Sequence, residues 1–261
     1  MSTEESHPKT NGLDQMSASD LAKVIAGENA VAVGAALAAH EGLAKAIEWV
    51  AEAFQAGGRT VYVGAGTSAR IAAADAAEMP PTFGVEPGRF LAIVAGNAAT
   101  QAVEGAEDDT EAAQRAIDDL AIETRDVVIG ISASGRTPFV IAAITAAKTR
   151  TIGIANNPNS PLLEAADLGI LLDTGPEVLT GSTRLKAGTA QKIALNTIST
   201  GAMVLAGRVR GNAMSHMTPK NDKLRARAIR IVSTSLGISE SDASKKLENA
   251  NWDLPKALAS E

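Results

Sequence analysis

The sequence predicts an α/β protein with a doubly wound, parallel, five-stranded sheet. Five short apolar runs are continuous rather than alternating, which is typical of strands buried on both faces. They lie at residues 60–64, 90–94, 126–131, 151–155 and 168–172. Helical segments separate most of these runs, as in sheets that carry helices on both faces. Ligands bind such sheets at the carboxyl ends of the strands, so the residues that follow each run are the candidates for a functional site.

The chain before the first run is expected to add helices to the sheet. Residues 1–16 predict a flexible N-terminus. Ser17-Ala-Ser-Asp20 resembles a helix start with Ser or Asp as its cap. An Ala-rich stretch from Val31 to Ala56 carries apolar residues at helical spacing. It predicts one long helix that ends at Gly57-Gly58.

The chain after the fifth run predicts a long helix and a small helical module. The long helix covers about Lys186 to Ala206. A boundary near residue 210 is expected to separate a main domain, residues 17–210, from a C-terminal module, residues 211–261. The helices of the module are expected near Asp222–Leu236, near Glu240–Asn249 and after Asp253.

The composition excludes several functions. Hydrophobic residues make up 45% of the chain and charged residues 21%, as in ordinary globular proteins. Aromatic residues make up 3% and the net charge is −6. Neither base stacking nor polyanion binding is therefore expected, and we expect no nucleic acid partner. A local pocket for a small anion remains compatible with this charge.

The chain contains no cysteine, which excludes disulfides, thiolate nucleophiles and cysteine-held metals. Its three histidines, His7, His40 and His216, are scattered, so no metal and no other cofactor is expected. No segment approaches the ~20 apolar residues of a membrane span, and the polar start lacks the apolar centre of a signal peptide. These features predict a cytoplasmic protein without a membrane partner.

A glycine-rich turn follows the first apolar run. Gly64-Ala-Gly-Thr-Ser-Ala-Arg70 places Gly66, Thr67 and Ser68 at a helix start, where exposed amides and hydroxyls favour an anion. The turn is not a Walker A loop, and it lacks the third glycine of a dinucleotide fingerprint. Taken alone, it fits a purely structural turn between strand and helix equally well.

A hydroxyl-rich loop follows the third run. Ser132-Ala-Ser-Gly-Arg-Thr-Pro138 brings Ser132, Ser134 and Thr137 into one turn, which also holds Arg136. Pro138 fits the first position of a helix, with Thr137 as the cap. Two such loops after neighbouring strands would converge on one phosphate, and the alternative is two solvated turns.

A third polar segment, residues 175–189, follows the fifth run. It places Ser182, Thr183, Arg184 and Lys186 at the start of the long helix. Hydroxyls and cations in this position suit an anionic ligand.

Two glutamates are candidates for acid–base chemistry. Glu78 lies near the end of the first crossover helix, on the same face as Asp75 by its i,i+3 spacing, and Pro80-Pro81 is expected to end that helix. Glu107 follows the second run, in Val-Glu-Gly-Ala-Glu-Asp-Asp109. Each glutamate alone also fits a solvated charge or a helix cap.

In this order, the segments GAGTSAR, AAEMPPTFG, VEGAED, ISASGRTP and GPEVLTGSTRLKAGTAQK resemble the N-acetylmuramic acid 6-phosphate etherases of the sugar isomerase (SIS) superfamily. The resemblance covers about residues 10 to 250. It implies a flavodoxin-like SIS fold and a cytoplasmic, metal-free homodimer of amino-sugar catabolism and peptidoglycan recycling. The implied reaction cleaves the D-lactyl ether of the phosphosugar to give N-acetylglucosamine 6-phosphate and D-lactate.

The resemblance assigns catalysis to Glu78 and Glu107. Glu78 would protonate the departing lactyl oxygen, and Glu107 would remove the proton at C2. This pair suits the chemistry, because the open-chain aldehyde makes C2 acidic and an alkoxide leaves only when it is protonated. Burial and mutual repulsion would keep one carboxyl protonated and the other ionised. The sugar phosphate is expected on Gly66, Thr67, Ser68, Ser132, Ser134, Arg136, Thr137, Ser182, Thr183 and Lys186.

The sequence departs from the family pattern at three places. Ala69 stands where a glycine is usual, which is tolerated where φ is negative. His216 and Lys220 stand where Asp and Thr are usual, which bears on the choice of substrate, although His216 also fits a cap or a solvent-facing residue. The C-terminus is shorter than in many relatives, and its end resembles a three-helix ubiquitin-associated-like module, from which we infer no ubiquitin binding.

Two other functions stay open at this point. A regulatory protein that binds a sugar phosphate would need the phosphate loops but not the two glutamates. An isomerase, or a lyase for a different phosphosugar, would share proton abstraction at C2. An isomerase would then return the proton to C1 and expel nothing.

Overall fold

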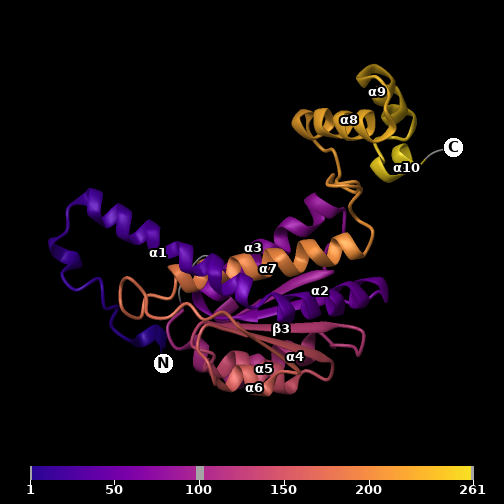
Figure 1. Cartoon of the computed structure of the whole chain (residues 1–261). Helices are drawn as coiled ribbons and strands as arrows, with labels where there is room; N and C mark the ends of the chain where they lie inside the picture. The colour runs from indigo at the N-terminus through magenta and orange to yellow at the C-terminus, as the bar shows by residue number, and fades with distance from the viewer. Residues whose placement is uncertain (1, 98–102, 260–261) are drawn as a thin grey trace.

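A single parallel sheet forms the centre of the molecule (Figure 1). The computed structural model describes residues 2–97 and 103–259. The sheet has the order β2-β1-β3-β4-β5. Its strands are β1 (Thr60–Gly64), β2 (Phe90–Val94), β3 (Val127–Ser132), β4 (Arg150–Ala155) and β5 (Leu168–Leu171). The predicted five-stranded parallel sheet is therefore confirmed.

The register of the sheet places the glycine-rich and hydroxyl-rich loops side by side. β1 pairs with β3, and Gly64 at the end of β1 lies opposite Ile131, one residue before the end of β3. Every residue of both strands is buried. Two of the continuous apolar runs therefore correspond to β1 and β3, the strands that precede the two candidate ligand-binding loops.

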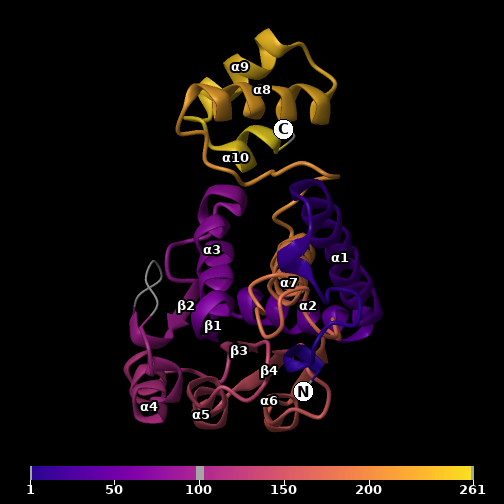
Figure 2. The same cartoon turned by 90° about the vertical axis from the view of Figure 1, so that its left-hand side faces the viewer.

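Helices cover both faces of the sheet (Figure 2). The helices of one layer share a hydrophobic core with Ile129, Ile152 and Ile170 on one face of the sheet. Those of the other layer pack against Val61, Val63 and Val128 on the opposite face. The first layer consists of α1 (Ala18–Ala38), α2 (His40–Gln55), α3 (Gly66–Phe83) and α7 (Lys186–Leu205). The second consists of α4 (Thr110–Asp119), α5 (Pro138–Ala146) and α6 (Pro161–Ala165).

The single helix predicted from Val31 to Ala56 was wrong. The chain breaks at Ala39 into α1 and α2, and α1 begins at Ala18, after the Ser17 cap that the sequence predicted. The break has a cause on each side. Val33 and Leu37 are 50% and 68% exposed and face away from the core, whereas α2 turns its apolar face onto the sheet.

Helix α1 is also longer and more apolar than the sequence predicted. By length and composition alone, Ala18–Ala38 is a helix that could cross a membrane, and only 17% of its most apolar window is buried. Its polar residues tie it to α7: Glu28 accepts from Lys186 at 2.8 Å, and Asn29 accepts from Thr189 at 2.9 Å. These contacts fix α1 to the sheet domain.

The N-terminus differs from the flexible segment that was predicted. Residues 2–16 include two short 3-10 helices, Ser2–Glu4 and Leu13–Gln15. Thr3 is fully buried and accepts at Oγ1 from Asn157 Nδ2 at 2.7 Å. Thr10 Oγ1 donates to the Val178 carbonyl at 2.9 Å. Side-chain hydrogen bonds to distant loops, which local sequence does not reveal, hold this segment.

The expected end of the first crossover helix was also wrong. α3 continues through Pro80 and Pro81 to Phe83 and stops at Gly84, whose φ is +60°. Proline fixes φ near a helical value, but each of the two prolines removes one backbone amide donor from this last turn. The Gly84 amide closes the turn by donating to the Pro80 carbonyl at 3.0 Å.

The last three helices share a hydrophobic cluster of their own. They are α8 (Asp222–Leu236), α9 (Glu240–Asn249) and α10 (Leu254–Leu258), at the positions expected from the sequence. Figure 1 shows them grouped away from the sheet. The segment that leads to them packs on the end of α3, where a Cβ on Gly84 would lie 2.1 Å from the His216 carbonyl oxygen. Only glycine fits there.

Candidate active site

The loop after β3 gathers its hydroxyl groups as the sequence predicted. Ser132 Oγ lies 2.8 Å from Thr137 Oγ1 and 3.3 Å from Ser134 Oγ. The Gly135 amide donates to Ser132 Oγ at 3.0 Å, and the Arg136 amide donates to Ser134 Oγ at 3.1 Å. Pro138 is the first residue of α5, so the three hydroxyls surround a helix N-terminus. This arrangement suits a phosphate group.

The loop after β1 opens into α3. Gly66, the first residue of the helix, has φ +55°, a conformation that glycine adopts easily. Thr67 is half-buried and Ser68 is buried. Ala69 is fully buried within the helix and does not have a positive φ, so its replacement of glycine is accommodated.

A cavity of about 340 Å³ lies beside this turn. It brings Gly66 and Arg70 from the start of α3 together with Glu107 from the short 3-10 helix Ala106–Asp108. The rest of its lining is Ala65, Val94, Ala95, Val103, Glu104, Gly105 and Ala106. Glu107 is exposed, and a carboxylate beside a helix N-terminus and an arginine can take a proton from a bound anionic substrate.

The segment of residues 175–189 meets the first loop at the start of α7. A Cβ on Gly188 would lie 3.4 Å from Thr67 Cγ2 and from the Thr183 carbonyl oxygen. Ser182 and Thr183 are half-buried, and Arg184 is exposed. The third segment therefore meets the first loop where Gly188 lies against Thr67.

Two charged residues of this segment serve the fold. Glu177 is fully buried and accepts from the amides of Lys186 and Ala187 at 3.2 and 2.9 Å, which caps α7. Burial raises the pKa of Glu177, although these two amides oppose the rise. Lys186 was expected to bind phosphate, but its Nζ is buried against Glu28. Neither Glu177 nor Glu28 was predicted from the sequence. Glu28 pairs with a lysine 158 residues away, whereas Glu177 caps α7 from nine residues before Lys186.

Glu78 and Asp75 do not share an environment, contrary to their i,i+3 spacing. Asp75 is buried and accepts hydrogen bonds from Tyr62 Oη at 2.8 Å, Asn196 Nδ2 at 2.6 Å and Ser199 Oγ at 3.0 Å. Burial and the neighbouring Asp75 carboxylate raise the pKa of Tyr62 far above its ordinary value. Asp75 is thus a structural link between β1, α3 and α7.

Glu78 itself is exposed and does not line the cavity of Glu107. It lies twelve residues after Gly66, which is about 18 Å along the axis of α3. Within one chain, Glu107 therefore shares a cavity with Gly66 and Arg70 at the start of α3. Ser132, Ser134, Thr137 and Glu78 are not among the described residues that line it.

The two departures near the C-terminal module lie outside this cavity. His216 is half-buried beside Gly84, and its Nδ1 lies 3.0 Å from Ser215 Oγ. Burial lowers the pKa of His216, and the charge of Arg208 lowers it further. Lys220 is exposed. In one chain neither residue is among the described residues that line the cavity of Glu107.

Comparison with known proteins assigns the chain to a family. A model of the SIS domain matches residues 107–200, and a model of the glucokinase regulatory protein N-terminal SIS domain matches residues 42–148. A protein named N-acetylmuramic acid 6-phosphate etherase from Geobacillus thermodenitrificans is 46% identical over 99% of this chain and 89% of its own length. The chain belongs to the N-acetylmuramic acid 6-phosphate etherase family.

Other relatives agree with this assignment. An etherase of Streptomyces coelicolor is 41% identical over 99% of this chain and 85% of its own length. A phosphoheptose isomerase structure from Neisseria gonorrhoeae matches with a TM-score of 0.51 at 20% identity, covering 72% of this chain and 99% of that one. The structural match supports the SIS fold alone, whereas the sequence matches support the etherase family.

Proposed function

We propose that this protein is a carbon–oxygen lyase that cleaves the D-lactyl ether of N-acetylmuramic acid 6-phosphate. The products are N-acetylglucosamine 6-phosphate and D-lactate. The observation that carries the proposal is the 46% identity to a named etherase over almost the whole chain. The cluster of Ser132, Ser134 and Thr137 beside a helix N-terminus supports a phosphorylated substrate.

The loops at the carboxyl edge hold the sugar phosphate in this proposal. Ser132, Ser134 and Thr137 donate hydroxyl hydrogen bonds to the phosphate, and amides at the start of α5 and α3 add to them. Thr67, Ser68, Ser182 and Thr183 extend the same polar edge. Anchoring the phosphate fixes the reacting carbons relative to the protein, which lowers the entropic part of the barrier.

The two glutamates then carry the proton transfers. In the open-chain sugar the C1 aldehyde acidifies the C2 proton, and Glu107 takes that proton. The electron pair forms the C2–C3 double bond as the C3–O bond breaks, and Glu78 gives its proton to the lactyl oxygen. Water then adds its hydroxyl to C3 and a proton to C2, which restores a saturated sugar.

The protein works as a homodimer in this proposal. Among the described residues, large exposed apolar side chains gather on α1 and α7: Ile25, Val31, Val33, Leu37, Val204 and Leu205. Monomeric proteins rarely leave such surfaces open. In this dimer the second copy would also cover Glu78, which is exposed in one chain. We therefore propose that each site combines Glu107 of one subunit with Glu78 of the other.

The proposed compartment is the cytoplasm. A phosphorylated sugar is a dianion that does not cross a lipid bilayer unaided, because transfer of charge into hydrocarbon is costly. An enzyme that consumes it belongs where the phosphate ester is made and retained.

The direct test is a D-lactate assay on the purified protein with N-acetylmuramic acid 6-phosphate. We expect release of D-lactate in equal amount to N-acetylglucosamine 6-phosphate. Substrate binding without lactate release would contradict the proposal and favour a regulatory sugar-phosphate-binding protein. A ketose product without lactate would instead indicate an isomerase.

The dimer is tested with Leu37→Asp. Leu37 is 68% exposed on α1, and an aspartate there would place a charge in the apolar contact. We expect analytical ultracentrifugation to find a dimer for the unchanged protein and a monomer for the variant. Leu179→Asp is the matched control, because Leu179 is 58% exposed but lies outside α1 and α7. Equal masses for all three proteins would contradict the proposed interface.

A further inference from the structure

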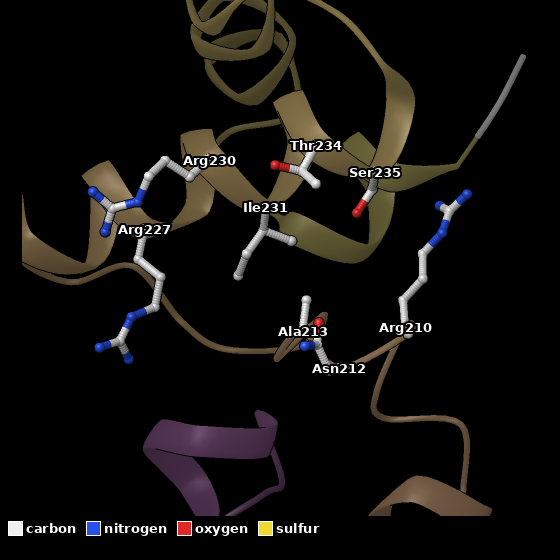
Figure 3. A pocket seen from close by; sticks show the side chains of 9 residues that line it. Arg210, Asn212, Ala213, Arg227, Arg230, Ile231, Thr234 and Ser235 are labelled. Carbon is white, nitrogen blue, oxygen red and sulfur yellow. The ribbon is translucent and has the colours of Figure 1, made fainter.

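A second polar cavity lies in the C-terminal module, apart from the candidate active site. It has a volume of about 430 Å³ and lies between helix α8 and the turn of residues 210–213 (Figure 3). The turn is closed by two backbone hydrogen bonds between Arg210 and Ala213, at 3.1 and 2.9 Å. The volume lies in the range of small-molecule sites.

One face of α8 forms the other wall. Arg227, Arg230, Ile231 and Thr234 follow the i, i+3, i+4, i+7 spacing that puts side chains on one side of a helix. Figure 3 shows Arg227 and Arg230 at one end of the cavity and Arg210 at the other, with Ile231 between them. The cavity thus has two cationic ends and an apolar middle.

The three arginines keep most of their donor groups available. Arg210 Nη1 donates to the Leu258 carbonyl at 2.7 Å, which fixes its side chain against α10 and leaves its other N–H groups free to bind. Within residues 2–97 and 103–259, no carboxylate forms an ion pair with Arg210, Arg227 or Arg230. None of the described residues that line the cavity is acidic.

The charge of the module contrasts with that of the rest of the chain. Residues 211–261 hold eight Lys and Arg against six Asp and Glu, whereas residues 1–210 hold sixteen against twenty-four. A positive cavity in an acidic protein attracts small anions selectively, because the negative remainder repels extended polyanions. This contrast favours a small ligand over nucleic acid.

We propose that this cavity is a second ligand site, which binds a small anion with a phosphoryl group at one end and a carboxylate at the other. Arg227 and Arg230, adjacent on one helix face, hold the phosphoryl group, because guanidinium groups pair well with phosphate oxygens. Arg210 binds the carboxylate, and the Thr234 and Ser235 hydroxyls lie along the same wall. Ile231 contacts the carbon chain between the two charges.

The test is a titration of the full-length protein followed by the backbone amide resonances of Ile231, Thr234 and Ser235. These resonances report this cavity separately from any binding at the sheet. The probes are 6-phosphogluconate, which carries both acidic groups, and glucose 6-phosphate, which lacks the carboxylate. We expect both to shift the three resonances, with tighter binding of 6-phosphogluconate.

Three variants separate the parts of the site. Arg227→Gln/Arg230→Gln should weaken binding of both probes by about tenfold, as loss of charge-assisted hydrogen bonds does. Arg210→Gln should weaken 6-phosphogluconate alone, which also tests the site if the double variant fails to fold. Lys223→Gln removes one positive charge from α8 outside the cavity and should change neither affinity.

Several results would overturn the proposal. The first is that neither probe shifts the three resonances. The second is that the unchanged protein binds the two probes with equal affinity. The third is that Lys223→Gln loses as much affinity for the probes as the double variant. The last result would indicate diffuse attraction without a site. A duplex DNA oligonucleotide that shifts the same resonances at lower concentration would reassign the surface to nucleic acid.

Discussion

Replacing Glu107 or Glu78 by Gln is expected to lower the rate of D-lactate release by about 10²–10⁴-fold, the usual contribution of a positioned acid or base. The two variants should differ in one respect. Glu107→Gln should also stop exchange of the C2 proton with solvent deuterium, because the base is gone. Glu78→Gln should keep that exchange, because only protonation of the leaving oxygen is lost.

Proton exchange measured by NMR in heavy water therefore separates the two roles. Glu104→Gln is a suitable control, because Glu104 is exposed and lines the same cavity as Glu107. It should retain lactate release. Exchange that survives in Glu107→Gln and vanishes in Glu78→Gln would reverse the two assignments, and full activity in either variant would remove that residue from the mechanism.

Mixing the two inactive variants tests whether the site is shared between subunits. If the protein is a dimer with shared sites, random reassociation makes half of the dimers mixed, and each mixed dimer then holds one site with both glutamates intact. If each site takes Glu107 from one subunit and Glu78 from the other, the mixture should regain about a quarter of the unmutated activity. A mixture that stays inactive would mean that both glutamates of a site come from one chain.

The sheet and the conformation of the hydroxyl-rich loop after β3 were predictable because their signals are local. The short apolar run at Val127–Ser132 predicts a strand buried on both faces, which the structure has. Ser132, Ser134 and Thr137 are close in sequence, and the Ser132 hydroxyl lies within hydrogen-bonding distance of the other two hydroxyls. The helices of the C-terminal module lie where the sequence predicted them, and the side chains of Asn221, Ser239 and Asp253 cap their N-termini by accepting backbone amides.

The errors arose where distant residues decide the structure. The residues around Thr3 and Thr10 do not predict the hydrogen bonds with Asn157 and Val178 that hold the N-terminus. The break at Ala39 depends on which apolar side chains pack against the sheet. Periodicity alone does not reveal that Leu43 is buried there while Leu37 is exposed. Likewise, the i,i+3 spacing of Asp75 and Glu78 did not reveal that only Asp75 points at Tyr62.

The pairing of Lys186 with Glu28 has the largest expected effect on stability. The Lys186 side chain is 3% exposed and that of Glu28 is 21% exposed, and their charged atoms lie 2.8 Å apart. His7 Nε2 lies 3.2 Å from the same Glu28 carboxylate, so one acid ties the N-terminus, α1 and α7 together. Glu28→Gln would leave the buried ammonium without a counter-charge.

We expect Glu28→Gln to lower the free energy of unfolding at neutral pH by about 3 kcal/mol, the cost of removing one partner from a buried pair. Urea denaturation followed by circular dichroism measures it. Glu28→Gln/Lys186→Met should regain most of the loss, because no unpaired charge is then buried. Glu111→Gln, which breaks an exposed pair with Arg115, should leave stability nearly unchanged.

The pH dependence of this loss has a definite sign. The hydrogen bond from Lys186 lowers the pKa of Glu28, and the charges of Lys186 and His7 act in the same direction against the opposing effect of burial. A carboxyl whose pKa is lower in the folded state stabilises the protein fully above its unfolded value and loses that contribution as the pH falls through the folded value. The difference between the unchanged protein and Glu28→Gln should therefore shrink in acid. A difference that grows as the pH falls would mean that Glu28 does not carry the charge that balances Lys186.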